Sequence, residues 1–148
     1  MKMRIEIDIN EKYEDLSVEI KSPRLTPDIE KMISMLRILG MQILGKKDNE
    51  TFVLDVAEIL YIEAVERDTF LYTENEVYES DFKLYELEQQ LTERDFFRVS
   101  KSTLINLKKV KSLKADLNRR IRVTMVNGEQ IIASRMYADE LRKRLGIK

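Results

Sequence analysis

The first 25 residues contain two runs in which apolar and polar side chains alternate. The apolar positions are Met3, Ile5, Ile7 and Ile9 in the first run, and Leu16, Val18 and Ile20 in the second. Successive side chains of a strand point to opposite faces, so each run predicts a half-buried strand with a single apolar face. The sequence therefore predicts two short paired strands at the start of the chain.

The spacing of apolar residues then changes to that of a helix. Thr26 suits the N-cap and Pro27 the first helical position. Apolar residues continue at helical spacing from Ile29 to Leu44, and methionines widen the apolar face beyond one stripe. Two interpretations remain open for this wide face. In the first, the apolar face packs on its own hairpin and on the following domain. In the second, it forms a dimer or partner interface.

A domain boundary is predicted at Gly45–Glu50, where turn residues separate two periodic segments. It divides the chain into a strand-strand-helix segment, residues 1–45, and a second domain, residues 46–148. Strands are predicted at Thr51–Leu54, Glu58–Ala64, Thr69–Thr73, Val77–Ser80, Phe97–Val99, Val110–Ala115, Ile121–Val126 and Gln130–Ala133. Helices are predicted at Phe82–Leu91 and after Ser134, with Gly146 ending the last one. The predicted fold class is β-rich α+β.

Charge is distributed unevenly along the chain. Lys46–Glu93 holds 4 basic and 14 acidic residues, a net charge of -10, whereas Arg94–Lys148 holds 15 basic and 5 acidic residues, a net charge of +10. A clustered basic surface is expected of a protein that binds the phosphate backbone of nucleic acids. The alternative is an interaction module or adaptor whose basic block binds an acidic protein.

Candidate catalytic and metal-binding residues are few. The chain has no His and no Cys, so it lacks the commonest general base, the commonest metal ligand and the thiol nucleophile. Glu63, Glu66 and Asp68 are close in sequence, but an exposed strand end with its loop explains them better than a metal site. We therefore expect no enzyme, no cofactor and no metal. The sequence shows no signal peptide and no membrane span, which predicts a cytoplasmic protein.

Three segments resemble the LytTR DNA-binding domain in order and spacing. They are EILYIEAVERDTFLYTENEVYESDFKLYELEQQL, FFRVSKSTLINLKKVKSL and NGEQIIASRMYADELRKRL, and the resemblance spans Lys46–Leu145. It implies a fold of about ten strands in small packed sheets with short helices. It also implies a transcription regulator that enters successive major grooves of duplex DNA through loops, usually on paired, imperfectly repeated sites.

The resemblance also implies where DNA is read. The base-reading positions match the loop with Arg67 and Asp68, the pair Ser100 and Lys101, and Arg135. The chemistry agrees, because the planar fork of arginine pairs with the O6 and N7 acceptors of guanine. We expect further contacts to the DNA backbone from Arg98, Ser102, Lys108 and Lys109. Asn106, Asn127 and Gly128 are expected to shape turns, and Phe96 and Phe97 to lie in the core.

The sequence departs from the family pattern in two respects. Many members have His followed by Asn or Arg where this chain has Ser100 and Lys101, so the target sequence cannot be transferred. Most members also carry a receiver domain, and 45 residues are too few for one. The layout resembles stand-alone LytTR regulators that some bacteria pair with a small inhibitory membrane protein. Residues 1–45 would then mediate homodimerisation or contact that membrane protein.

Overall fold

The computed structural model describes residues 2–147. Its α-helices are α1 (Pro27–Leu39), α2 (Leu84–Leu91) and α3 (Arg135–Arg144). Its strands are β1 (Gln42–Lys47), β2 (Glu50–Asp55), β3 (Tyr61–Val65), β4 (Asp68–Tyr72), β5 (Val77–Ser80), β6 (Phe96–Arg98), β7 (Thr103–Asn106), β8 (Val110–Ala115), β9 (Ile121–Met125) and β10 (Gln130–Ala133). Short 3-10 helices lie at Val56–Glu58, Thr92–Arg94, Leu107–Lys109 and Leu117–Arg119.

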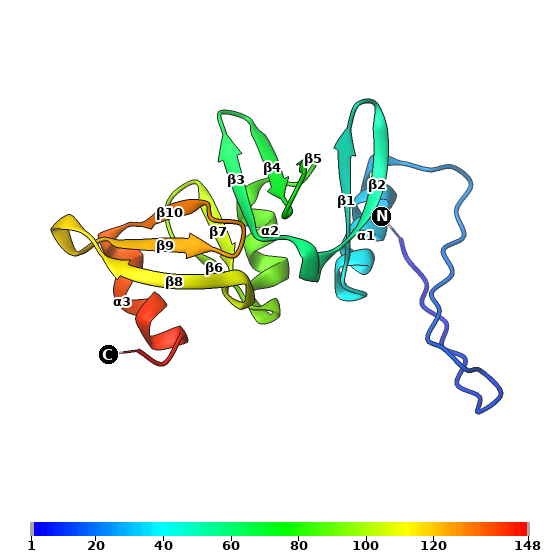
Figure 1. Cartoon of the computed structure of the whole chain (residues 1–148). Helices are drawn as coiled ribbons and strands as arrows, with labels where there is room; N and C mark the ends of the chain where they lie inside the picture. The colour runs from blue at the N-terminus through cyan, green and yellow to red at the C-terminus, as the bar shows by residue number, and fades with distance from the viewer. Residues whose placement is uncertain (1, 148) are drawn as a thin grey trace.

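The strands form two antiparallel sheets. The larger sheet has seven strands in the order β2-β1-β5-β4-β3-β7-β6, and the smaller has three in the order β10-β9-β8. Figure 1 shows α1 beside the β1–β2 hairpin, α2 beneath the middle of the larger sheet and α3 beneath the smaller sheet. The predicted β-rich α+β class, with ten strands and short helices, is confirmed.

Each sheet has its own hydrophobic core. The first core is formed by Ile38, Ile43, Leu54, Val56, Ile59, Ile62, Leu71, Leu84, Leu87, Leu91, Phe96 and Leu104. The second core joins the edge of the larger sheet to the smaller sheet and α3, through Leu60, Tyr61, Phe97, Val99, Ile105, Ile121, Val123, Met125, Ala133, Ala138 and Leu141. Neighbouring residues of β3 and of β6 point into different cores, so these strands hold the two halves together.

The sequence located most of this domain correctly. Strands β5, β8 and β10 have the predicted bounds, and the other predicted strands after Glu50 differ only at their ends. The end of α3 is also confirmed: Gly146 has φ +71°, and the N–H of Ile147 donates to the C=O of Arg142 at 2.8 Å. Strands β1 and β7 were not predicted.

The two predicted N-terminal strands are not formed. The structure assigns no strand to residues 2–20, and every side chain in that range is exposed. An isolated two-stranded hairpin is marginal in water, because neither strand has a sheet or helix against which to bury its apolar face. The prediction of a ββα segment is therefore wrong in its strands, while its helix is confirmed as α1 with Thr26 as N-cap.

The helix ends earlier than its apolar spacing predicts. It stops at Leu39, and Met41 then takes a left-handed φ of 64° and packs against the first core. Ile43 is buried in β1. Ile43 and Leu44 follow Leu39 by four and five residues and so continued the helical spacing by coincidence. The spacing alone could not show where the helix ends.

The expected boundary at Gly45–Glu50 lies inside a hairpin. Gly45 is a β1 residue at which a Cβ atom would approach the Tyr78 Cβ to 2.7 Å, so only glycine fits this contact between neighbouring strands. Asp48 and Asn49 both have positive φ and form the tight turn to β2. The turn residues that suggested a domain boundary therefore belong to the larger sheet.

Candidate nucleic-acid interface

The first predicted reading site is the turn between β3 and β4. Val65 pairs with Asp68, so Glu66 and Arg67 form a two-residue turn in which Glu66 has φ 58°. The Arg67 and Asp68 side chains are exposed. The Lys83 ammonium donates a 2.8 Å hydrogen bond to the Arg67 C=O. This contact fixes the backbone of the turn and leaves the Arg67 guanidinium directed to solvent.

The second site is the turn between β6 and β7. The N–H of Ser102 donates to the Ser100 Oγ at 3.2 Å, which closes a compact turn with Lys101 at its exposed tip. Ser100 and Ser102 are half-buried, and their hydroxyls lie 3.5 Å apart. The turn therefore presents the Lys101 ammonium between two hydroxyl groups.

Arg98 supports this second turn from inside the protein. Its Nε donates to the Ser100 C=O at 2.8 Å, its Nη2 to the Lys101 C=O at 2.5 Å, and its Nη1 to Glu88 Oε1 at 3.0 Å. The side chain is only 19% exposed. The guanidinium thus holds both turn carbonyls and links them to α2. This arrangement favours a positioning role over the phosphate contact that the sequence predicted.

The third site is the junction of β10 and α3. Ser134 is the N-cap, although its side chain makes no capping hydrogen bond, and Arg135 is the first residue of the helix. Arg135 is exposed, and its side chain pairs with no carboxylate among residues 2–147. Together with Asn118 and Arg120 it lines an open hollow of about 270 Å³.

Two backbone hydrogen bonds bring the three sites together. The Ala64 N–H donates to the Ser102 C=O at 2.8 Å, which places the β3–β4 hairpin beside the β6–β7 turn. The Ser134 N–H donates to the Val99 C=O at 2.8 Å, which places the start of α3 beside the other end of that turn. The predicted reading loops, distant in sequence, are therefore linked to one another by main-chain hydrogen bonds.

Lys108 and Lys109 lie farther along the chain, in the 3-10 helix after β7. The Asn106 side chain caps this helix, since its Oδ1 accepts from the Lys108 N–H at 3.0 Å. Lys108 is exposed and its Nζ lies 3.3 Å from Asp95 Oδ2, while Lys109 is half-buried. Neither lysine is joined to the reading turns by a hydrogen bond among the described residues.

The β8–β9 loop lies beside Arg135. From the sequence, Arg119 and Arg120 could contact the DNA backbone, but ordinary surface charge was the preferred interpretation. Asn118 and Arg119 have consecutive left-handed φ values of 57° and 64°, which direct the chain around a tight corner before Arg120. Asparagine is the one signal of such a corner in the sequence. The loop thereby places Arg120 in the same hollow as Arg135.

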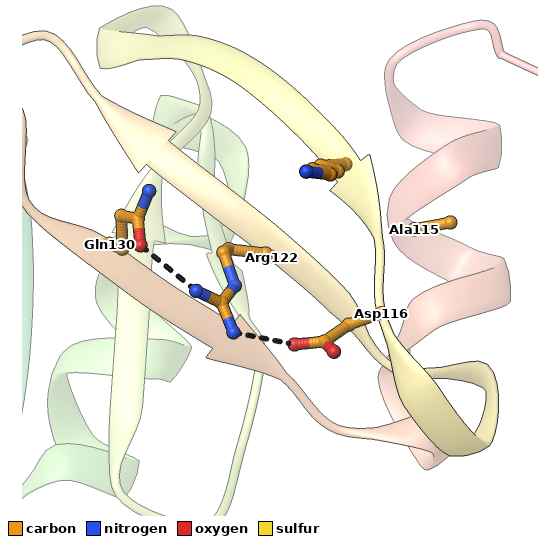
Figure 2. Close-up of a pocket in the computed structure, with 5 residues that line it drawn as sticks. Ala115, Asp116, Arg122 and Gln130 are labelled. Carbon is orange, nitrogen blue, oxygen red and sulfur yellow. Dashed lines mark hydrogen bonds and ion pairs between the residues drawn. The ribbon is translucent and has the colours of Figure 1, made fainter.

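A second hollow of about 290 Å³ lies on the outer face of the smaller sheet and includes Lys114 in its lining. Figure 2 shows the Arg122 guanidinium between two acceptors: Nη1 donates to Gln130 Oε1 at 3.2 Å and Nη2 to Asp116 Oδ2 at 3.2 Å. The N–H of Leu117 and the guanidinium of Arg122 hold the pKa of Asp116 below its usual value. Arg122 is thus neutralised locally, unlike Arg135.

Residues 2–147 do not contain the features of three other kinds of site. Within this range, no group of three Asp or Glu side chains is arranged as metal ligands, and no helix is long and apolar enough to cross a membrane. The α-helices of the same range are separated by strands, so no α-helix follows another directly as in a helix-turn-helix.

Comparisons with known proteins agree with this geometry. The model of the LytTr DNA-binding domain matches residues 49–146. Over 147 residues the chain is 25% identical to an HTH-type transcriptional regulator of Staphylococcus aureus strain MSSA476, covering 98% of this chain and 99% of that protein. The corresponding regulator of strain NCTC 8325 is 24% identical over the same length.

A solved structure shows the same fold. The LytTr DNA-binding domain from a Bacillus cereus protein superposes with a TM-score of 0.69 and 25% identity, covering 72% of this chain and 98% of that one. Strands β2 to β10 and the three predicted reading turns lie within the residues that the family model matches. The protein belongs to the LytTr DNA-binding domain family.

Proposed function

We propose that this protein is a transcription regulator that binds duplex DNA in a sequence-specific manner through the three connected turns. The observation that carries the proposal is the pair of backbone hydrogen bonds, Ala64 to Ser102 and Ser134 to Val99, that unites these turns. Family membership supports DNA as the ligand. Loops that enter a groove must keep a fixed separation, and main-chain bonds between them provide it.

Base reading is assigned to Arg135, Lys101 and Arg67, with Ser100 and Asp68 beside them. Arg135 is the strongest candidate because its guanidinium is exposed and pairs with no carboxylate among residues 2–147. A free planar fork can donate two parallel hydrogen bonds to the O6 and N7 atoms of a guanine in the major groove. Its position at the first turn of α3 holds the side chain at the protein surface.

Phosphate binding is assigned to Ser102, Lys108 and Lys109. Lys108 lies 3.3 Å from Asp95, an exposed ion pair that DNA phosphate can replace at small cost. We add Arg120 to this group because it shares the hollow with Arg135. Arg98 is excluded from it, because its three nitrogen atoms are occupied inside the protein.

The proposed regulator works as a homodimer on repeated sites, entering successive major grooves, in the cytoplasm and without catalysis. Paired sites require a symmetric pair of reading surfaces, and a two-fold dimer supplies them. A small inhibitory membrane protein that contacts residues 1–45 stays a prediction from sequence.

Selection of bound oligonucleotides from a random duplex pool, followed by sequencing, tests the proposal. The full chain should enrich a shared motif, and the Arg135→Ala variant should lose the preference at one base pair of it. Arg24→Ala is the matched control, since Arg24 is an exposed arginine outside the reading turns. If the folded chain enriches no motif, the proposal is wrong, and an acidic protein partner for the basic block becomes the better explanation.

A further inference from the structure

The N-terminal segment, residues 2–20, exposes a regular series of large apolar side chains. Ile5 is 73% exposed, Ile7 79% and Leu16 96%. In Figure 1 this segment, drawn in blue, runs away from the rest of the molecule. Soluble monomers rarely leave such a series of apolar residues in water, and a larger exposed set marks an interaction site.

The segment already contains the turn of a hairpin. The Tyr13 N–H donates to the Asn10 C=O at 3.1 Å, and the Lys12 N–H donates to Asn10 Oδ1 at 2.9 Å. Continuing this register brings the apolar residues of both arms to the same face. The opposed pairs are Ile7 with Leu16, Ile5 with Val18, and Met3 with Ile20. Next to the turn Ile9 lies opposite Glu14, so the apolar face runs from Met3 to Ile7 and from Leu16 to Ile20. A single hairpin of this kind is marginal in water.

The first arm of this hairpin, residues 2–9, has a charge pattern that is complementary to the same arm of a second copy. In an antiparallel pairing of two copies centred on Ile5, Arg4 lies opposite Glu6 of the other copy, and Lys2 lies opposite Asp8. Opposite charges in directly facing positions stabilise antiparallel strands. The Arg4 Nη2 and Glu6 Oε1 atoms of one chain are 3.4 Å apart, so both side chains point to the same side, as this pairing requires. The apolar residues of the arm then face one another.

The backbone groups agree with the same pairing. In the register set by the Asn10–Tyr13 turn, even-numbered residues of the first arm direct their N–H and C=O groups toward the second arm. Odd-numbered residues, Ile5 among them, direct theirs to the outer edge. A pairing centred on Ile5 uses this outer edge, so each arm can bond to its own hairpin and to the other copy at once.

We propose that two copies of this chain associate through the outer edges of their first arms, residues 2–9, forming a four-stranded antiparallel sheet with a two-fold axis at Ile5. Three or more strands with an apolar face reach the stability that one hairpin lacks. The exposed apolar side chains of Met35 and Leu39 in α1 are available to cover that face. The partner is a second copy because the charges of residues 2–8 are complementary to those of the same segment in antiparallel orientation.

This inference rests on the dimer of the proposed function, and its experiment contains no DNA. A failure here therefore removes this dimer surface and leaves the test by oligonucleotide selection unaffected. The full chain should form dimers in sedimentation equilibrium. Ile5→Glu places two carboxylates together on the axis and should weaken the dimer by at least about tenfold. Ile5→Val, which keeps an apolar strand residue, should leave association nearly unchanged.

Charge reversal tests the register. Arg4→Glu and Glu6→Arg should each weaken the homodimer by about tenfold, because like charges then face each other twice. In an equimolar mixture of the two variants, every Glu meets an Arg, so a mixed dimer of nearly the original affinity should form. A monomeric full chain, a dimer insensitive to Ile5→Glu, or mixtures no tighter than either variant alone would each overturn the proposal.

Discussion

The backbone N–H of Ser134 and the C=O of Val99 form a 2.8 Å hydrogen bond that joins the start of α3 to the β6–β7 turn. Val99 is fully buried, so water does not compete for this bond. Because both partners are main-chain atoms, the separation of Arg135 from Lys101 depends on the packing of two sheets. The proposed reading surface is therefore held by main-chain contacts between the sheets and not by a recognition helix.

Replacing Arg98 should weaken DNA binding without changing its dependence on salt. Arg98→Ala frees the carbonyls of Ser100 and Lys101 and leaves the turn mobile. Arg98→Lys keeps the charge but cannot reach both carbonyls and Glu88 together, so it should behave similarly. Affinity for the selected site, measured by titration at several salt concentrations, should fall by about tenfold. This change corresponds to the free energy of about one hydrogen bond to a charged group.

The salt slope separates the two possible roles of Arg98. If Arg98 binds phosphate, its substitution reduces the slope of log affinity against log salt by about one. If Arg98 positions the turn, the slope stays unchanged. The matched variant is Glu88→Gln, which removes the ion pair on the far side of the guanidinium and should weaken binding in the same direction by a smaller factor. A reduced slope for Arg98→Ala would restore the phosphate-binding role that the sequence predicted.

Asn106→Ala should strongly destabilise the fold. Asn106 is 3% exposed, its Nδ2 donates to the Ile59 C=O at 2.9 Å, and its Oδ1 accepts from the Lys108 N–H. Loss of the amide leaves a buried carbonyl and a helix N–H unpaired, a cost of about 2–4 kcal/mol in the free energy of unfolding. Urea denaturation measures it. Asn127→Ala, which removes one exposed turn bond to Glu129, should cost less than about 1 kcal/mol.

The sequence was most informative where local chemistry and tertiary packing agree. Strands β5 and β10 contain β-branched or aromatic residues, and their bounds, like those of β8, were predicted. Gly146 marks the end of a helix and Asn127-Gly128 marks a hairpin turn through their own backbone preferences, and both features are confirmed. Strand β7 was missed because all four of its residues, Thr103–Asn106, are buried, so it shows no alternation.

The candidate site needed information that no local pattern contains. The resemblance placed Arg67, Lys101 and Arg135 at their turns, but the hydrogen bonds that unite those turns join residues far apart in sequence. The Glu88 carboxylate accepts a hydrogen bond from the Arg98 guanidinium, and only the packing of α2 on β6 reveals that interaction. The role of Arg120 likewise depends on the turn that brings it beside Arg135.

Stability should fall above pH 10 because of a buried tyrosine. Burial raises the pKa of Tyr61 to about 12, and the carboxylates of Glu129 and Glu63 act in the same direction. The Tyr61 ring stacks on Tyr72 with centroids 4.3 Å apart. Between the unfolded pKa of about 10 and the folded value, the unfolded chain releases a proton that the folded chain keeps. The full stabilisation is therefore present below pH 10 and is lost as the pH rises toward 12.

Tyr61→Phe isolates this effect. The variant should show a smaller fall in its urea midpoint between pH 10 and pH 12 than the unaltered chain, since phenylalanine has no proton to release. In an absorbance titration of the tyrosine side chains, the ionisation with the highest pKa should be absent from the variant. An identical alkaline fall in both proteins would mean that other groups cause it.

Arg135 and Lys109 should differ in what their loss does to DNA binding. If Arg135 donates its fork to one guanine, Arg135→Ala should cost about 1–3 kcal/mol on the selected site and little on random duplex. If Lys109 contacts phosphate, Lys109→Ala should weaken both duplexes equally and reduce the salt slope by about one. Binding titrations on the two duplexes at several salt concentrations measure both quantities.

Arg135→Lys is the decisive control, because it retains the positive charge and removes the planar fork. A base reader should then resemble the alanine variant in sequence preference, while its salt slope stays near that of the unaltered chain. A phosphate contact should instead be preserved by lysine on every duplex. Arg135 lies in a hollow with Arg120, so a remaining cation is present in either variant to hold the DNA backbone. Equal losses on selected and random duplex after Arg135→Ala would therefore show that Arg135 only positions the protein, and base reading would have to come from Lys101 or Arg67.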